Sequence, residues 1–175
     1  MNYTIRQALP SDARGYINLI RSILREQPPV DTPYAPDEFD PPVQRIRDRI
    51  IEVNDSDNSV FLIAEASGRT IGALTCGGGS LKADRHMTAL GIYVAKAWRD
   101  RGVGSALMKA CVEWAQASPV VERVELEVFA GNARAIHVYE KFGFVHEGVK
   151  RRLYYQNGSP VDMAIMALLL ERKQS

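Results

Sequence analysis

The stretch WRDRGVGSAL, residues Trp98–Leu107, places two glycines and a cluster of charged residues at the start of a helical pattern. Gly102 and Gly104 stand one residue apart, and a helical apolar pattern runs on from Val103. The first four N–H groups of a helix have no intrahelical partner, and the helix dipole adds partial positive charge at the same end. The stretch therefore predicts a helix whose N-terminus can hold an anion.

Four interpretations of Gly102-Val103-Gly104 compete. A dinucleotide fingerprint needs a third glycine three residues on, where Leu107 stands. A Walker phosphate loop needs Gly-Lys-Ser/Thr after four spacers, and none is present. The other two are a pyrophosphate site built from backbone N–H groups and a tight strand-to-helix turn without a ligand. The motif by itself leaves these two open.

Apolar periodicity on both sides of the stretch predicts the remaining elements. Strands are expected at residues 3–9, 60–66, 70–76, 88–94, 124–129, 144–155 and 161–170, and helices at 13–24, 43–53, 103–114 and 133–142. Ser11 and Asn132 are the expected N-caps, and Gly143 is the expected C-terminal stop of the last helix. Hairpin turns are expected at residues 67–69 and 157–158.

This order of elements predicts an α/β fold: a mixed central sheet of about seven strands with helices on both faces. With 175 residues and neither a repeat nor a linker, we expect a single domain over residues 1–175.

Composition narrows the classes of partner. Lys plus Arg number 22 against 21 for Asp plus Glu, so no broad basic surface for nucleic acid is expected. Cys76 and Cys111 form no CxxC pair, the three histidines are scattered, and we expect no metal site. The longest apolar run, residues 163–170, is far shorter than the roughly 20 residues of a membrane span. The first residues lack the apolar core of a signal peptide, which favours a cytoplasmic location.

Two blocks resemble one protein family. Arg99-x-x-Gly102-x-Gly104, after the strand that ends at Val94, is similar to the acetyl-CoA site of the GNAT N-acetyltransferases. Residues 132–144 resemble the family's second block, N-x-x-A-x-x-x-Y-x-x-x-G-F. The blocks follow the family's order, and the resemblance covers nearly the whole chain, most weakly over residues 27–58. It points to the bacterial members that act on amino acids and other small amines, or to those that modify protein N-termini.

The resemblance implies acetyl-CoA as the donor substrate and its pyrophosphate as the anion. The backbone N–H groups implied to hold it are those of Arg101, Gly102, Val103, Gly104 and Ser105. The side chains of Arg99 and Arg101 would add charge there or remain solvated on the surface. Pantetheine would pair with the exposed strand edge through Ile92 and Val94, and a backbone N–H near Tyr93 or Val94 would stabilise the oxyanion.

The resemblance also implies direct transfer to the amine without an acetyl-enzyme. Tyr139 is the candidate acid for the departing thiolate, with a core tyrosine as the alternative. Glu127, at the end of its strand and five residues before Asn132, is the candidate base, with a solvated glutamate as the alternative. Asn132 is expected to cap its helix and is a candidate contact for the cofactor arm or the incoming amine.

The acceptor is the least determined part. The loop Glu26–Asp40 holds five acids and no base, which suits a cationic amine and equally a solvated loop. We expect a small primary amine such as an amino acid or a polyamine. The alternatives are the α-amine of a protein N-terminus and a non-catalytic acetyl-CoA-binding module. The expected partners are therefore small molecules, without nucleic acid or membrane, and a homodimer is left open.

Overall fold

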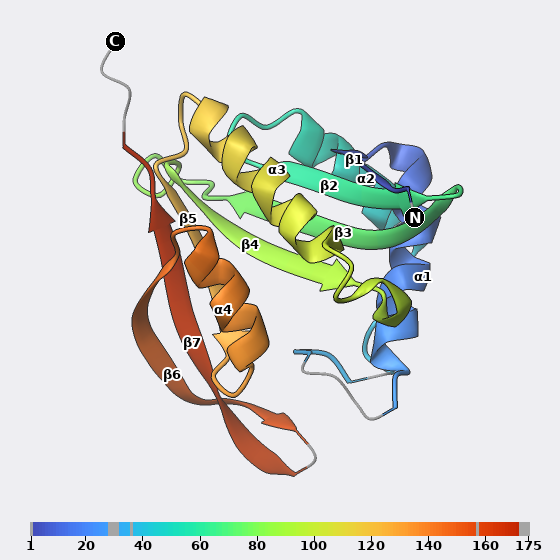
Figure 1. Ribbon diagram of the computed structural model, residues 1–175. Coiled ribbons are helices and arrows are strands. Elements are labelled where there is room, and N and C mark those ends of the chain that lie inside the picture. Colours follow the sequence, from blue (N-terminus) through green and yellow to red (C-terminus); the bar gives the residue numbers. More distant parts are fainter. Residues whose placement is uncertain (1, 28–31, 36, 157, 172–175) are drawn as a thin grey trace.

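One mixed sheet of seven strands organises the chain, in the order β1-β2-β3-β4-β5-β7-β6 (Figure 1). The computed structural model describes residues 2–27, 32–35, 37–156 and 158–171. The strands are β1 (Thr4–Gln7), β2 (Val60–Ala66), β3 (Arg69–Gly78), β4 (Met87–Val94), β5 (Arg123–Phe129), β6 (Val145–Gln156) and β7 (Ser159–Leu169). Neighbouring strands are antiparallel except β4 and β5, which are parallel. The predicted α/β fold with a seven-stranded mixed sheet is confirmed.

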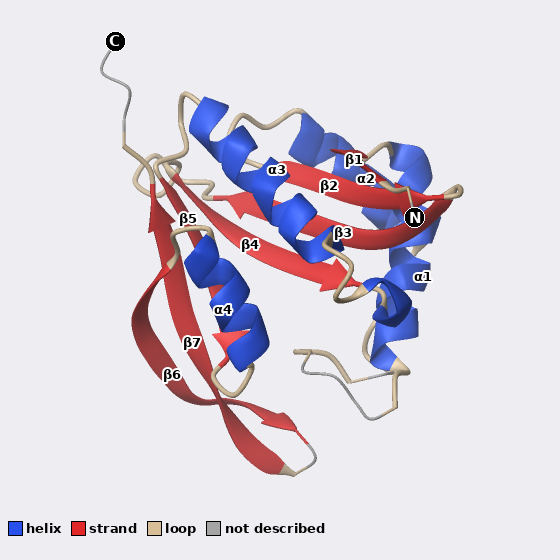
Figure 2. Ribbon diagram, viewed as in Figure 1, coloured by secondary structure: helices blue, strands red, loops and turns tan. Residues whose placement is uncertain are grey.

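Helices cover both faces of the sheet (Figure 2). They are α1 (Ala13–Leu24), α2 (Val43–Asn54), α3 (Val103–Ala117) and α4 (Ala133–Lys141), with short 3₁₀ turns at Pro10–Asp12 and Lys96–Trp98. One apolar core lies between the sheet and the helices α3 and α4, and a second lies between the sheet and the helices α1 and α2. None of the described helices has the length and apolar character needed to cross a membrane.

The start of α1 differs from the prediction. Ser11 was expected to cap this helix, but it lies exposed in the 3₁₀ turn that precedes it. Asp12 holds the N-cap position of α1 but makes no side-chain hydrogen bond to the helix, because its carboxylate accepts a hydrogen bond of 2.7 Å from the Leu9 N–H at the start of the 3₁₀ turn. Arg6 on β1 holds that carboxylate with two further bonds of 2.7 and 2.8 Å, which lower the pKa of Asp12. The Asp12 side chain thus binds the 3₁₀ turn and Arg6 of the preceding strand, and does not cap α1.

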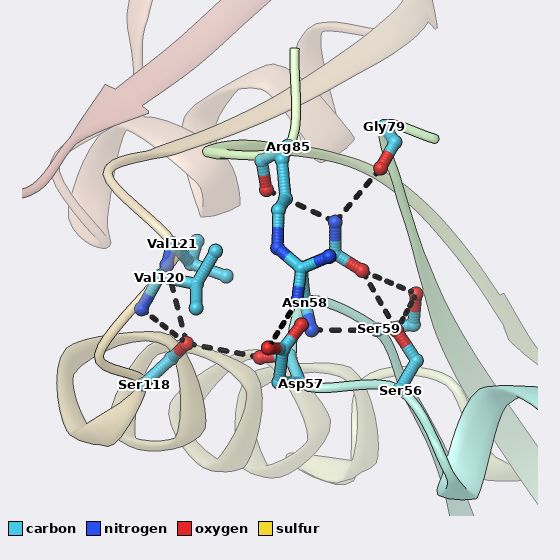
Figure 3. A network of polar contacts seen from close by, with 9 residues as sticks. All are labelled: Ser56, Asp57, Asn58, Ser59, Gly79, Arg85, Ser118, Val120 and Val121. Atoms are coloured by element: carbon cyan, nitrogen blue, oxygen red, sulfur yellow. Dashed lines mark hydrogen bonds and ion pairs between the residues drawn. The ribbon is translucent and has the colours of Figure 1, made fainter. Parts of the chain in front are cut away.

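A polar network anchors the end of β3 and the beginning of β4 (Figure 3). Asn58 is buried, its Nδ2 donates to the carbonyls of Gly79 and Arg85 at 2.9 Å, and its Oδ1 accepts from Ser56 Oγ at 2.7 Å. Gly78 leaves the room for this amide, since a Cβ there would lie 2.1 Å from it. The network fixes one end of β4, and the glycine-rich stretch follows the other end.

Candidate active site

The strands β4 and β5 part halfway along their length. Their parallel pairing runs only from Met87–Arg123 to Leu90–Leu126. Beyond that point β4 stays paired with β3, whereas β5 stays paired with β7. The last four residues of β4 therefore have a strand on one side only, as expected for the strand before the glycine-rich stretch.

Strand geometry shows which backbone groups of β4 face the opening. The Ala95 N–H donates to the Ile71 carbonyl at 2.9 Å, so this pair is hydrogen-bonded across the antiparallel β3–β4 ladder. Hydrogen-bonded and non-hydrogen-bonded pairs alternate in such a ladder. The amide of Tyr93 therefore points towards β3, and the amides of Ile92 and Val94 point into the opening. Of the two expected oxyanion donors, this geometry favours Val94 over Tyr93.

A cavity of about 860 Å³ fills the space between the parted strands. It reaches from the beginning of α3 along β4 and β5 to the loop after α1, with α4 along one side. The sequence-predicted residues that line it are Ile92, Tyr93, Val94, Arg99, Gly104, Glu127, Asn132 and Tyr139. The structure thus brings eight of the predicted site residues to one cavity, which we call the cleft.

The glycine-rich stretch forms the N-terminus of α3. Gly102 is the N-cap with a φ of 80°, a left-handed conformation that favours glycine. Val103, Gly104 and Ser105 form the first turn, whose N–H groups have no intrahelical acceptor. Gly104 faces the cleft, and a Cβ built there would meet only Val94 Cγ2, at 3.9 Å. The stretch therefore offers open space beside a cluster of backbone donors.

The arginine side chains of this stretch have protein partners of their own. Arg99 forms a two-pronged ion pair with Glu26, 2.7 Å for each bond, and its Nε donates to the Val94 carbonyl at 3.0 Å. The Glu26 side chain is only 7% exposed, so this pair is largely removed from water. Arg101 lies over the Trp98 ring, 5.9 Å from its centroid. The Arg99 guanidinium therefore ties the end of α1 to the end of β4.

The helix α4 presents Tyr139 and Asn132 to the cleft. Tyr139 is buried and its ring lies 6.1 Å from that of Phe144, while burial raises the pKa of its phenol to about 12. Asn132 caps the helix as predicted, since its Oδ1 accepts from the Ala135 N–H at 3.1 Å. Gly143 ends the helix region with a φ of 87°. Tyr139 is both part of the core and part of the cleft wall.

Glu127 is on the open face of β5, opposite the buried Val124, Leu126 and Val128. Its carboxylate forms an ion pair with Lys150 of β6, which the sequence reasoning missed. The register of β6 against β7 explains this contact, because it sets Lys150 beside Met163, another residue of the cleft. This ion pair raises the pKa of Lys150. The candidate base thus has a cation in contact with it.

Apolar and aromatic side chains, also missed from sequence, line the half of the cleft away from α3. They include the Tyr93 side chain, which packs towards α1 and α2, and Phe129 and Tyr154, whose ring centroids are 6.2 Å apart. Gln156 at the end of β6 donates to the Thr32 carbonyl at 3.2 Å and so joins this hairpin to the loop after α1. The turn residue Asn157 lies outside the described residues.

Neither cysteine lines the cleft. Cys76 and Cys111 are buried between β3 and α3 with their sulfur atoms 3.4 Å apart, and burial and their mutual contact raise the pKa of Cys76. The described residues contain no group of three or more potential metal ligands.

Comparisons with known proteins agree with this geometry. Residues 17–144 match the family model of the acetyltransferase (GNAT) family. An L-amino acid N-acetyltransferase of Escherichia coli K12 is 40% identical over 106 residues, which are 61% of this chain and 65% of that protein, just under two thirds of its length. An N-alpha-acetyltransferase of Sulfurisphaera tokodaii is 32% identical over 117 residues, 62% of this chain and 68% of that protein.

Solved structures share the whole architecture. A GNAT-family acetyltransferase from Streptococcus pneumoniae superposes with a TM-score of 0.91 at 29% identity, covering 97% of this chain and 100% of that one. A phosphinothricin acetyltransferase from Sinorhizobium meliloti, solved with acetyl-CoA, has the same fold, with a TM-score of 0.83 at 21% identity over 97% of this chain and 89% of that one. The chain belongs to the GNAT acetyltransferase family.

Proposed function

We propose that this protein transfers the acetyl group of acetyl-CoA directly to the primary amine of a small molecule, with an L-amino acid as the first candidate. The observation that carries the proposal is the cleft between β4 and β5, with free backbone amides on one wall and Glu127 and Tyr139 on the other. The Escherichia coli relative is an L-amino acid N-acetyltransferase, which supports an amino acid as the acceptor.

The donor end of the cleft suits a diphosphate and an extended amide chain. The N–H groups of Val103, Gly104 and Ser105 would hold the pyrophosphate of coenzyme A at the N-terminus of α3. The amides of Ile92 and Val94 would pair with pantetheine as a further strand pairs with a sheet edge. The complex of the Sinorhizobium meliloti enzyme with acetyl-CoA supports the choice of donor.

The remaining residues supply the proton transfers. Glu127 accepts a proton from the substrate ammonium, directly or through water, so that the neutral amine can attack the thioester carbon. A backbone N–H at the free edge of β4 stabilises the oxyanion while the new C–N bond forms. The C–S bond then breaks and Tyr139 gives its phenolic proton to the departing thiolate, while the extra proton on the newly bonded nitrogen is lost and restores the phenol as the amide forms. With both cysteines outside the cleft, no thiol of this chain is placed to form an acetyl-enzyme.

One hydrogen bond beside the cleft bears on the size of the acceptor. The half of the cleft away from α3 would receive the acceptor, and we call it the acceptor half. The hydrogen bond from Gln156 to Thr32 joins the two segments that flank this acceptor half. Such a bridge restricts a polypeptide more than a small molecule, which favours a small amine. The second candidate is acetylation of a protein N-terminus, and it is supported by the similarity to the N-alpha-acetyltransferase of Sulfurisphaera tokodaii.

Release of coenzyme A, measured with a panel of amines, tests the proposal. The panel holds L-amino acids, polyamines, aminoglycosides and peptides with free N-termini. We expect turnover with small amines and a preference for amino acids over peptides. Faster turnover of the peptides would favour the second candidate. Tight binding of acetyl-CoA without thiol release for any acceptor would identify a non-catalytic acetyl-CoA-binding module and refute the proposed activity.

A further inference from the structure

Opposite charges stand side by side in the acceptor half of the cleft. Glu127 lines the cleft near the end of β5, and the Lys150 ammonium on β6 contacts its carboxylate. The two side chains remain 35% and 46% exposed, so incoming solutes can reach both of them. Neither charge is needed to hold a strand in place, because β5 and β6 are each hydrogen-bonded to β7.

Lys150 lies beside the cleft through its contact with Glu127, and the two cations that line the cleft itself have partners elsewhere. Arg99 is bound to the nearly buried Glu26 through two hydrogen bonds. Arg134 at the start of α4 forms an ion pair of 2.7 Å with Asp100, in the glycine-rich stretch at the donor end. Lys150 is therefore the cation that this geometry offers to an acceptor next to Glu127.

We propose that Glu127 and Lys150 together recognise the zwitterionic head group of an α-amino acid, with Lys150 binding the carboxylate. The inference rests on the proposed function and names the acceptor class of the same site. An α-amino acid carries an ammonium and a carboxylate on neighbouring atoms, so it can replace one ion pair by two of the same kind. Its ammonium takes the place of Lys150 on Glu127, and its carboxylate takes the place of Glu127 on Lys150.

The consequence is selectivity against amines without a carboxylate. When such an amine binds Glu127, it displaces Lys150 and leaves that ammonium without an anion. Discrimination of this kind comes from a charge that one ligand pairs and the other leaves unpaired. A polyamine fares worse, because its second cation approaches the displaced ammonium. The pair therefore selects amino acids before any side-chain pocket is considered.

The experiment compares each L-amino acid accepted by the wild-type protein with its carboxamide, which keeps the amine and loses the negative charge. Lys150→Met should lower kcat/KM for the amino acid by about 10-fold or more, mainly through KM, the size of one charge-assisted hydrogen bond. The value for the carboxamide should stay the same or rise. Lys150→Arg should retain the preference for the amino acid, since guanidinium also binds carboxylate.

Arg151→Met is the matched control. Arg151 is the next residue of β6, is exposed, and forms no ion pair within the described part of the chain. Its loss should leave both kcat/KM values unchanged. An equal fall for amino acid and carboxamide in Lys150→Met would overturn the inference, because Lys150 would then only position Glu127. Unchanged kcat/KM values for both substrates in Lys150→Met would overturn it as well.

The inference and the proposed function fail in different ways. Wild-type turnover of amines and carboxamides without any preference for the amino acid would overturn the inference and leave the acetyltransferase activity standing. Absence of turnover with every acceptor, in a sample that binds acetyl-CoA, would overturn the proposed function and the inference that depends on it.

Discussion

A substitution at Gly104 tests whether the glycine-rich stretch is a binding site or only a turn. A methyl group fits there, since a Cβ would lie 3.9 Å from its nearest neighbour, and a carboxylate near a helix N-terminus favours the helix. Gly104→Asp should therefore fold with undiminished stability and still lose acetyl-CoA binding, because its charge would repel the pyrophosphate. Gly104→Ala, the control without charge, should lose far less affinity. Calorimetric titration measures the affinity for acetyl-CoA, and urea unfolding measures the stability of each variant. If both variants bind acetyl-CoA as tightly as the wild type does, the stretch is only a turn.

Tyr139 has a role in the core and a proposed role in catalysis, and removal of its hydroxyl separates them. Tyr139→Phe keeps the ring beside Phe144, so the fold and the affinity for acetyl-CoA should be preserved. We expect kcat to fall by about 10²–10⁴-fold, the usual contribution of a general acid. Burial holds the phenol pKa at about 12, so the acid stays protonated and should cause no loss of wild-type activity between pH 7 and 10. An unchanged kcat, measured where chemistry is rate-limiting, would leave Tyr139 as a core residue only.

Glu127→Gln tests the base. Glutamine still accepts a hydrogen bond from Lys150 but cannot take a proton from the substrate. Turnover should fall near neutral pH and recover partly as the pH rises, because more of the amine is then already neutral in solution. The affinity for acetyl-CoA should stay constant, since Glu127 belongs to the acceptor half of the cleft. A pH–rate profile identical to that of the wild type would place deprotonation elsewhere, for instance at Glu125.

At the scale of elements, the pair of Arg99 and Glu26 joins two parts that are distant in sequence. Arg99 precedes α3 and Glu26 follows α1, so the pair connects the end of the cleft near α3 with the start of the loop after α1. Loss of Glu26 would leave the guanidinium with its Val94 bond alone. Glu26→Ala should cost about 1–3 kcal/mol of unfolding free energy and raise the acceptor KM.

Glu113→Ala gives the comparison for that loss. Glu113 pairs with Lys109 along the exposed face of α3, where such pairs contribute about 0.3–0.5 kcal/mol. Urea denaturation of both variants gives the difference directly. If Glu26→Ala costs no more than Glu113→Ala, the Arg99 pair has no special structural role.

Sequence patterns predict features that depend on neighbouring residues, such as some helix caps, but not contacts between distant segments. The caps of α4 were correct because Asn132 and Gly143 act within their own turn of chain. The expected cap of α1 was wrong because a 3₁₀ turn precedes the helix and moves its N-cap position from Ser11 to Asp12. Contacts such as Arg99–Glu26 and Lys150–Glu127 join residues far apart in sequence, and no periodicity carries their register.

At the scale of the molecule, the sequence predicted the sheet, the covering helices and the end of β4 where the cleft opens. It could not predict how far β4 and β5 stay together, since the backbone pairing that ends at Leu90 leaves no mark in the side-chain pattern. The acceptor half was unpredictable for the same reason. Its walls come from α1, β4, β5, β6 and the loop at Thr32, which only the complete fold brings together.

Acetyl-CoA should stabilise the whole molecule if, as we propose, it binds in the cleft, where the two halves of the sheet are least connected. Ligand at 100 times its Kd adds about 2.7 kcal/mol to the unfolding free energy. For a chain of this size, that corresponds to a rise in Tm of roughly 5–11 °C. Thermal melts with and without acetyl-CoA measure the shift, and Gly104→Asp, which should show none, is the control.

Hydrogen exchange locates the same effect. The first half of the sheet, β1 to β4, and the second half, β5 to β7, are paired only over Met87–Leu90 and Arg123–Leu126. In the proposed site, acetyl-CoA would contact both sides of the opening, so protection should increase most at the amides of Ile92 and Val94 and in the first turns of α3 and α4. The far end of β4, fixed by the Asn58 network, should change little. A rise in Tm without protection at Ile92 and Val94 would place the ligand somewhere other than the cleft.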